Sequence, residues 1–304
     1  MVKGIYLVNR RRADVDKEVG VMRSLLGIDV ESMFFEDIVT TVGDNDDDTM
    51  LLADGKRVPL PDFVSVRAFG LDANESYRLK SVLRMLEGKG VLCINPASCK
   101  DITSDKLLTF QIASTVIPDV RIPKTLLVTP GMDPRTIGEG IGYPVVLKVL
   151  HGEGGSGIVL AESEAELKNL LKLVNGAPFG DQIIAQEAIM SSKGRDLRLI
   201  VLGGQVVDAL VRVNPGSFTS NVHQGGHVEE FDPPQELKDA AVRFAEAIGM
   251  VMGSVDFLFG ENEGEFYLCE ANSSVGLPYL MDSTRGDVSK RYLDGMNRLL
   301  ELVR

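Results

Sequence analysis

The 304-residue sequence contains no tryptophan, only three cysteines and three histidines, and 6% aromatic residues. An odd number of cysteines without metal-binding spacing predicts reduced thiols, and Cys93 and Cys269 lie in apolar, strand-like runs. No histidine is close to any of them in sequence, so a catalytic cysteine is not expected. His223 and His227 lack His or Cys partners, which favours loop or substrate contacts over zinc ligation.

The sequence also lacks an excess of positive charge and any long apolar run. Its net charge is −12 and its isoelectric point is about 4.8. Nonspecific binding to a nucleic-acid backbone is therefore not expected. No run reaches membrane-spanning length, and the N-terminus does not have the form of a signal peptide. We therefore expect a cytoplasmic protein with neither a nucleic-acid nor a membrane partner.

The hydrophobic pattern predicts an α/β (α+β) fold. At 304 residues the chain is long enough for two or three packed units, and its 44% apolar and 25% charged residues are an ordinary soluble composition. Strand and helix patterns alternate up to about residue 100, which favours a parallel sheet. Ser104 is expected to cap a helix that ends near Val116. The last third is mainly strands joined by tight turns, which favours an antiparallel sheet.

A predicted hairpin near the C-terminus places carboxylates in apolar strands. Asp256 lies in one strand, and Glu270 and Asn272 lie in or just after the other. Buried carboxylates need a cation or hydrogen bonds, and these oxygen ligands suit Mg²⁺. A salt-bridged hairpin is the alternative. A regular register about the turn at 261–264 would pair Glu270 with Val255, so a shared metal ion requires a bulge or a shifted turn.

Two cations also interrupt apolar strands. Lys148 precedes a turn with four glycines at 152–157, which favours a flap over nucleotide phosphates, with a plain flexible hairpin as the alternative. The turn matches neither a Walker A loop nor a dinucleotide fingerprint. Arg212 is a fixed cation suited to a phosphate or an oxyanion, unless alternation turns it to solvent.

In their order along the chain, these motifs resemble those of the ATP-grasp superfamily, and within it the RimK-type amino-acid ligases. The resemblance covers the whole chain. It rests on Ser104–Lys106, Lys148 with the 151–157 loop, Gln186–Ala188 with Asp196, Arg212, the loop from Thr219 to Gly226, and the set Asp256, Glu270 and Asn272.

The resemblance implies three domains and a set of ligand contacts. The domains would be an N-terminal pre-ATP-grasp domain at 1–95, a central lid domain at 96–185, and a C-terminal domain at 186–304 that carries the metal site. One or two Mg²⁺ ions, or Mn²⁺ instead, would bind Asp256, Glu270 and Asn272. ATP would bind Lys106, Lys148, Gly154, Gly155, Ser156, Gly157, Glu187, Ala188, Asp196, Ser220 and Asn221.

The implied activity is ATP-dependent joining of a carboxylate to an amine through an acyl phosphate, with release of ADP and phosphate. Arg212, Lys148 and Asn221 would be catalytic. An amino acid would be added to a peptide, a protein tail or a small molecule. The alternatives are a dipeptide-forming ligase, a small-molecule kinase and a nucleotide-binding module without catalysis. By analogy with related ligases, a homodimer or homotetramer is expected.

Departures from the family pattern concern the substrate. Thr219 stands where an Arg is common, and Asn272 is followed by Ser-Ser-Val-Gly where Ala-Ser-Pro-Gly is frequent. The residues expected to contact the substrate are Arg67, His223, Ser274 and Gly276.

Overall fold

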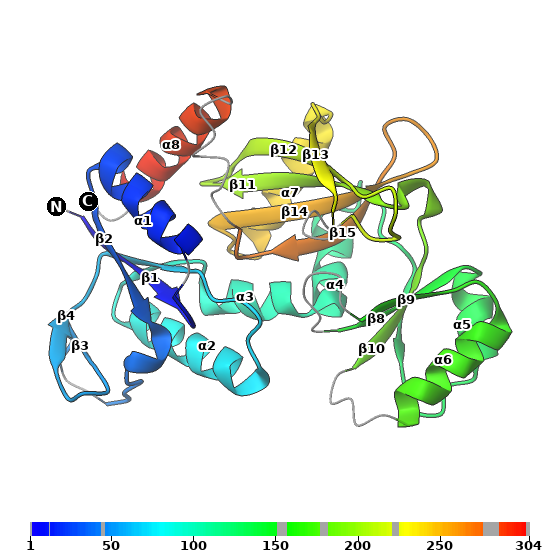
Figure 1. The fold of residues 1–304 in the computed structure, drawn as a ribbon, viewed down its shortest axis with the longest axis horizontal. Coiled ribbons are helices and arrows are strands. Elements are labelled where there is room, and N and C mark those ends of the chain that lie inside the picture. The colour runs from blue at the N-terminus through cyan, green and yellow to red at the C-terminus, as the bar shows by residue number, and fades with distance from the viewer. Residues whose placement is uncertain are drawn as a thin grey trace.

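Three larger sheets, one small hairpin and the helices packed on them make up the described part of the chain (Figure 1). The computed structural model describes residues 2–11, 13–43, 46–150, 157–176, 182–220, 225–275 and 286–301. No helix within these ranges is both long and apolar enough to cross a membrane.

The first sheet is parallel, as the alternation of strands and helices predicted. Its order is β2-β1-β5-β6. Tyr6 and Val8 pack on the face that carries helix α1, whereas Ile5 and Leu7 pack with helix α2 on the other face. The elements are β1 (Lys3–Val8), α1 (Ala13–Leu26), β2 (Asp29–Phe34), the 3₁₀ turn η1 (Phe35–Asp37), β3 (Thr49–Leu51), β4 (Arg57–Pro59), β5 (Phe63–Val66), α2 (Ala73–Gly88) and β6 (Leu92–Ile94).

Two consecutive helices, α3 (Ala97–Ser104) and α4 (Lys106–Val116), lead from the first sheet to the other two. The predicted cap at Ser104 is wrong by one residue. Asp105 is the N-cap of α4, and its side chain accepts from Leu108 N. Ser104 is already the last residue of α3, so only Asp105 has the extended backbone that a capping residue adopts.

The second sheet is antiparallel, with the order β7-β10-β8-β9. Val145 and Leu147 belong to the core that it forms with helices α5 and α6. Alternation therefore turns Lys148 to the opposite face of the sheet. The elements are β7 (Thr125–Val128), α5 (Pro134–Ile141), β8 (Val145–Val149), β9 (Ile158–Ala161), α6 (Glu164–Gly176) and β10 (Ile183–Glu187).

The third sheet is also antiparallel, with the order β13-β12-β11-β14-β15. Leu197 and Phe257 pack in one core with Phe110 of α4 and Phe244 of α7. The charged residues of the same strands alternate onto the face away from these helices. The elements are η2 (Met190–Ser192), β11 (Arg195–Leu202), β12 (Gln205–Val213), β13 (His227–Glu230), α7 (Gln235–Ala247), β14 (Met252–Phe259), β15 (Phe266–Asn272) and α8 (Gly286–Glu301).

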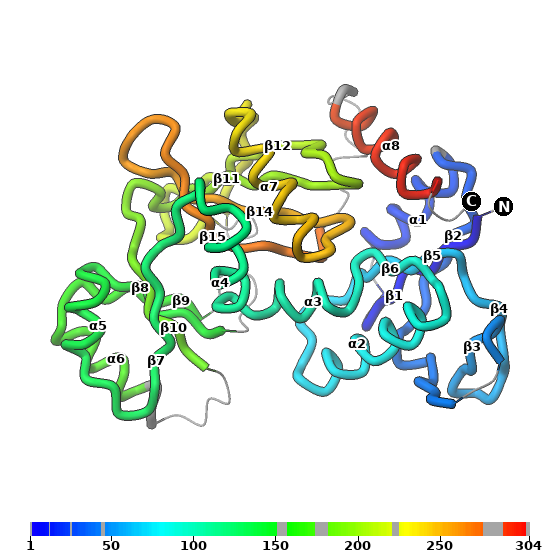
Figure 2. The backbone as a smooth tube through the Cα atoms, turned by 180° about the vertical axis from the view of Figure 1, so that it is seen from behind, coloured from blue at the N-terminus to red at the C-terminus, as the bar shows by residue number. Residues whose placement is uncertain are grey.

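Asn95, at the end of β6, fastens the first sheet to the third. Its fully buried amide donates to the carbonyl oxygens of Met252 (2.5 Å) and Ser273 (2.7 Å) and accepts from the backbone N–H groups of Val251 (2.6 Å) and Met252 (2.9 Å). From behind, β6 lies beside β5 in the first sheet, and α3 leads away from this sheet toward α4 (Figure 2). One side chain thus sets the position of the first sheet against the strands that carry the acidic residues.

Candidate active site

A buried network of charges lies on the face of the third sheet away from α4 and α7. Asp256 of β14 is fully buried, and its Oδ1 accepts from Arg198 Nε at 2.9 Å. Its Oδ2 accepts from Arg198 Nη2 at 2.6 Å and from Arg212 Nη2 at 2.9 Å. Arg212 also donates through Nε to Asp196 Oδ1 at 2.8 Å. Arg212 therefore faces the site rather than solvent, and it links two carboxylates on neighbouring strands.

The bulge that a shared metal ion requires is present between β14 and β15. Asp256 pairs with Glu270, but Phe257, the next residue of β14, pairs with Leu268 of β15. Cys269 is therefore an extra residue in the outer strand. The bulge brings the Asp256 and Glu270 backbones opposite each other, which a regular register about the turn would not do.

Asn272 completes this group of oxygen-bearing side chains. Its Nδ2 lies 3.1 Å from Glu270 Oε1 and 3.4 Å from Asp256 Oδ2. Asn272 Nδ2 therefore donates to both carboxylates, and a flip of the amide would turn Oδ1 toward a cation bound between them.

The charge and ligand types of this group fit a hard divalent cation. Three carboxylates, on Asp196, Asp256 and Glu270, face the guanidiniums of Arg198 and Arg212, which leaves one negative charge. Two carboxylates and an amide oxygen are ligands that Mg²⁺ accepts. Among the described residues, no group of three or more His, Cys, Asp or Glu side chains could hold a metal ion.

The network shifts the pKa values of its members. Burial acts to raise the pKa of Asp256, but the guanidiniums of Arg198 and Arg212 outweigh it and lower this pKa to about 2. Burial raises the pKa of Asp196 against the opposing effect of Arg212. Burial acts to lower the pKa of Arg212, but Asp256 and Asp196 outweigh it and raise this pKa above its usual value. Asp256 is therefore a fixed anion at neutral pH.

Both candidate phosphate-binding lysines lie around the end of β8. Lys148 is buried, and its Nζ donates to Gln186 Oε1 at 2.6 Å. Gln186 Nε2 in turn donates to Thr125 Oγ1 at 2.8 Å. Lys106 Nζ, at the start of α4, donates to the carbonyl oxygen of Leu150 at 3.3 Å.

The thiol of Cys269 is influenced both by Lys148 and by the acidic side chains of the network. Burial raises the pKa of its thiol to about 12, with an opposing influence from Lys148 and further raising influences from Glu270, Asp196 and Asp256. The second sheet therefore brings its buried cation near the bulged strand of the third sheet.

The end of β10, where the resemblance implies ATP contacts at Glu187 and Ala188, is held by hydrogen bonds to neighbouring segments. Glu187 N donates to Lys124 O at 2.8 Å, and Glu187 Oε2 accepts from Lys124 N at 3.1 Å. Ala188 N donates to Pro144 O at 3.3 Å. The Ser220 hydroxyl bonds to Asp196, which ties the loop after β12 to the charged network.

Gly157 is the described part of the glycine-rich turn. It has φ +73°, and a Cβ there would lie 2.7 Å from Val149 Cγ2, so this position demands glycine. Six predicted site residues lie outside the described residues: Gly154, Gly155, Ser156, Asn221, His223 and Gly276.

Two of the four predicted substrate contacts lie near each other, between the first and third sheets. Ser274 Oγ donates to Val66 O at 3.4 Å, directly before Arg67, and accepts from Lys100 Nζ at 3.2 Å. Arg67 is buried in a bidentate ion pair with Glu18, at 2.9 Å from Nε and 2.8 Å from Nη2.

Sequence reasoning missed Arg198 and Glu18 as members of these charged groups. The signal for Arg198 was its spacing of two from Asp196 in an apolar strand, which places both side chains on one face. Glu18 has no comparable signal. It lies on a helix, and its partner Arg67 is 49 residues away.

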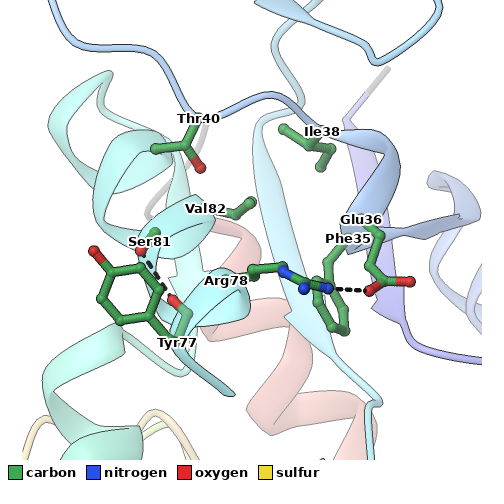
Figure 3. A pocket seen from close by; sticks show the side chains of 8 residues that line it. All are labelled: Phe35, Glu36, Ile38, Thr40, Tyr77, Arg78, Ser81 and Val82. Atoms are coloured by element: carbon green, nitrogen blue, oxygen red, sulfur yellow. Dashed lines mark hydrogen bonds and ion pairs between the residues drawn. The ribbon is translucent and has the colours of Figure 1, made fainter. Parts of the chain in front are cut away.

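A pocket of about 330 Å³ lies elsewhere, between η1, the segment that follows it and α2 (Figure 3). None of the predicted site residues lines it. Its Arg78 already pairs with Glu36 at 2.8 Å, and Ser81 donates to Tyr77 O at 2.9 Å. These polar groups are already paired within the chain, so the charged network remains the candidate site.

The sequence matches one family model and a set of named relatives. Residues 103–296 match the family model of the RimK-like ATP-grasp domain. A probable alpha-L-glutamate ligase of Rhodopirellula baltica is 32% identical over 229 residues, which cover 75% of this chain and 55% of the relative. Another, of Hydrogenovibrio crunogenus, is 33% identical over 215 residues, covering 70% and 69%. The matches span about half the length of the first two such relatives, 55% and 47%.

Solved structures share the fold at low sequence identity. D-cycloserine synthetase DcsG has a TM-score of 0.72 at 16% identity, covering all of both chains. The ATP-grasp ligase PsnB, complexed with a minimal precursor, has a TM-score of 0.70 at 16% identity, covering 98% of this chain and 100% of that one. At such identities, the likeness shows a common fold alone.

Proposed function

Since the chain belongs to the RimK-like ATP-grasp family, we propose that it is an ATP-dependent carboxylate–amine ligase that releases ADP and phosphate. The ATP-grasp fold implied by the motif order is confirmed by the solved structures. The observation that carries the proposal is the pairing of Asp256 with Glu270 across the bulge, beside Asn272 and Arg212.

In the proposed reaction, a substrate carboxylate oxygen attacks the γ-phosphorus of ATP. The bond from that phosphorus to the β–γ bridging oxygen breaks, which gives an acyl phosphate and ADP. An amine then attacks the acyl carbon and loses a proton, the C–O bond to phosphate breaks, and an amide and phosphate result. Arg212 is held by two carboxylates, so its guanidinium is oriented before the substrate binds and stabilises the charge on the transferring group.

Asp256, Glu270 and Asn272 would hold Mg²⁺, which when bound neutralises charge on the phosphate oxygens. Lys148 and Lys106 would bind phosphate oxygens from the second sheet and from α4. The hydrogen bond from Lys148 to Gln186 orients its ammonium before ATP arrives.

The proposed substrates follow from the names of the family relatives. Those compared are named probable alpha-L-glutamate ligases, and two solved neighbours, PsnB and the macrocyclase MdnC, are complexed with precursor peptides. We therefore propose that an amino acid, with glutamate tested first, is joined to a peptide, a protein tail or a small molecule. The domain boundaries at 1–95, 96–185 and 186–304 and a homodimer or homotetramer remain part of this proposal.

The test is to incubate the purified protein with Mg-ATP and amino acids, singly and in pairs, and with short peptides as acceptors. ADP and phosphate are measured together with the amide product by mass spectrometry. Release that requires both an acid and an amine supports the ligase. ADP without phosphate, together with a phosphorylated product, would indicate a kinase, and AMP with pyrophosphate would contradict the acyl-phosphate route.

A further inference from the structure

Lys148 is a buried cation that is held by a neutral side chain. Its Nζ donates to Gln186 Oε1 at 2.6 Å, and the two residues are 9% and 1% exposed. Because the acceptor is an uncharged amide, this hydrogen bond leaves the positive charge of the ammonium in place. Lysine binds phosphates as a point charge, so a fixed ammonium that is not neutralised suits that role.

The register of the second sheet brings a third side chain into line with these two. Gln186 of β10 lies directly opposite Thr125 of β7. Lys148 of β8 lies opposite Ile184, two residues before Gln186. Residues opposite each other or two apart share a face, and long side chains reach diagonal neighbours. Ala185 points to the other face, into the core of this sheet. Thr125, Gln186 and Lys148 therefore form a row across three neighbouring strands, the lysine relay.

The Thr125 hydroxyl determines which end of the Gln186 amide faces Lys148. Thr125 Oγ1 donates its one proton to the carbonyl oxygen of Pro123 at 2.8 Å, so it can only accept from Gln186. Gln186 Nε2 donates to this hydroxyl at 2.8 Å, which turns Oε1 toward the lysine. An ammonium has donors only, so the reverse orientation would set two donors against each other. Each hydrogen bond of the relay thus has a fixed direction.

Loss of the Thr125 hydroxyl would release this arrangement. Gln186 Nε2 would become a buried donor without its partner, which costs more free energy than the hydrogen bond itself contributes. The amide would then turn toward another acceptor. Lys148 has a flexible four-carbon stem, so the position of its ammonium depends on the contact that it would lose.

Resting on the proposed function, we propose that Thr125 and Gln186 are positioning residues that hold Lys148 for the phosphates of ATP. They act through Lys148 and not on the reacting atoms. The relay is neutral, so it fixes the ammonium without cancelling its charge. A carboxylate at position 186 would hold the lysine as well but would repel the phosphates.

Binding of Mg-ADP to the full chain, measured by calorimetry, tests the relay without any need for turnover. Thr125→Val keeps a β-branched side chain of nearly the same shape and removes only the hydroxyl. We expect this variant to bind ADP about tenfold more weakly, as follows from one buried donor left unpaired. Thr125→Ser restores the hydroxyl and should bind ADP as the parent does. Equal affinities of the parent and Thr125→Val overturn the inference.

Thr49→Val is the matched control. It makes the same change in β3, where the hydroxyl donates to Asp46 Oδ2 at 2.6 Å, outside the second and third sheets. It should leave ADP binding unchanged. A loss as large as that of Thr125→Val would show that removing any such hydroxyl has this effect, which contradicts a specific relay.

A double-mutant cycle with Lys148→Met separates positioning from a general loss of structure. Lys148→Met alone should weaken ADP binding by about tenfold to a hundredfold, since a charged hydrogen bond to phosphate is lost. Thr125→Val should then add nothing, because the hydroxyl acts through the ammonium. Circular dichroism checks that each variant is folded. A further loss in the double variant, or unchanged ADP binding by Lys148→Met, contradicts the relay.

Gln186→Glu tests whether the partner of Lys148 must be neutral. The carboxylate can still accept from the ammonium, but it places a negative charge beside the bound phosphates. We expect ADP to bind at least about tenfold more weakly, because like charges repel strongly in a buried site. Unchanged or tighter binding would contradict the need for a neutral partner.

These outcomes separate the inference from the proposed function. Amide formation by the parent, together with unchanged ADP affinity in Thr125→Val, would keep the ligase and overturn the relay. The expected pattern of ADP affinities, without an amide product under any condition, would keep the relay and overturn the ligase.

Discussion

Asp256 faces Glu270 directly across two antiparallel strands because Cys269 is an extra residue in the outer one. The two carboxylates differ in their surroundings. Asp256 is fully buried and paired with two guanidiniums, while the Glu270 side chain is 34% exposed and lies 3.9 Å from Arg198. Removing each carboxylate should therefore have different consequences for stability and for activity.

Glu270→Gln should reduce turnover by about 100-fold or more, because it removes a charged ligand from the proposed phosphoryl-transfer site. The free energy of unfolding should change by less than about 1 kcal/mol, since Glu270 is partly exposed and makes no close ion pair. Steady-state ADP release and urea unfolding measure the two quantities. Glu261→Gln, in the exposed turn of the same hairpin, is the control and should change neither. Unimpaired turnover would exclude Glu270 as a ligand.

The pH dependence of stability should report on Asp256. Its pKa is lowered from an ordinary 3.8 to about 2, so its stabilising effect is complete above pH 4 and is lost as the pH falls toward 2. The free energy of unfolding that Asp256 contributes, about 2 kcal/mol, should be lost over this range. Asp196, whose pKa is raised by burial, acts in the opposite direction.

Urea unfolding between pH 2 and 5 measures this effect, with Asp256→Asn as the comparison. The variant should be less stable than the parent at pH 5 and should have a shallower acid limb. Parallel curves for the two proteins would show that Asp256 is not the titrating group.

Arg212→Lys should lower turnover by about 100-fold, because a lysine keeps the charge but cannot bridge Asp196 and Asp256 with a planar fork. The loss should appear mainly in kcat, since the cation acts on charge that develops during the reaction. Arg195→Lys is the matched control, because that side chain stacks on Phe259 at 4.3 Å outside the network. An equal loss in both variants would contradict a specific role for Arg212.

Much of this arrangement could be predicted from the sequence. Lys148, Arg212 and Asp256 could be predicted as site residues, because a charged side chain in an apolar strand needs a partner. The alternation of strands and helices gave the parallel first sheet. The bulge at Cys269 could not be predicted, because period-two alternation does not show where a ladder admits an extra residue.

Ion pairs between residues far apart in the sequence could not be predicted either. Arg198 and Asp256 lie 58 residues apart, and their pairing depends on β11 and β14 being neighbours in the third sheet. The cap at Asp105 was missed because the preceding residues form a helix of their own, which local propensity did not reveal.

Cys269 should react slowly with iodoacetamide in the folded protein at pH 8. Burial raises its thiol pKa to about 12, so the reactive thiolate is about ten thousandfold less populated than the thiol. Mass spectrometry of modified peptides, before and after unfolding in guanidinium chloride, measures the rate. Rapid modification of the native protein would contradict the raised pKa of this half-buried thiol beside the acidic network.

Asn95→Ala should lower the free energy of unfolding by about 3 kcal/mol or more, because it leaves several buried backbone groups of β14 and its neighbours without partners. Asn95→Asp keeps the acceptors but loses the donors, and it should also destabilise the protein. Urea unfolding gives both values. A loss below about 1 kcal/mol would mean that this residue does not fasten the first sheet to the third.

The central claim, transfer of phosphate to a substrate carboxylate, is tested most directly with an acid labelled with ¹⁸O in both carboxylate oxygens. After turnover with Mg-ATP and an amine, the released phosphate is analysed by mass spectrometry. The proposed route predicts one ¹⁸O in each phosphate and one in the amide product. Phosphate without label, formed at the same rate as the amide, would contradict the acyl-phosphate mechanism.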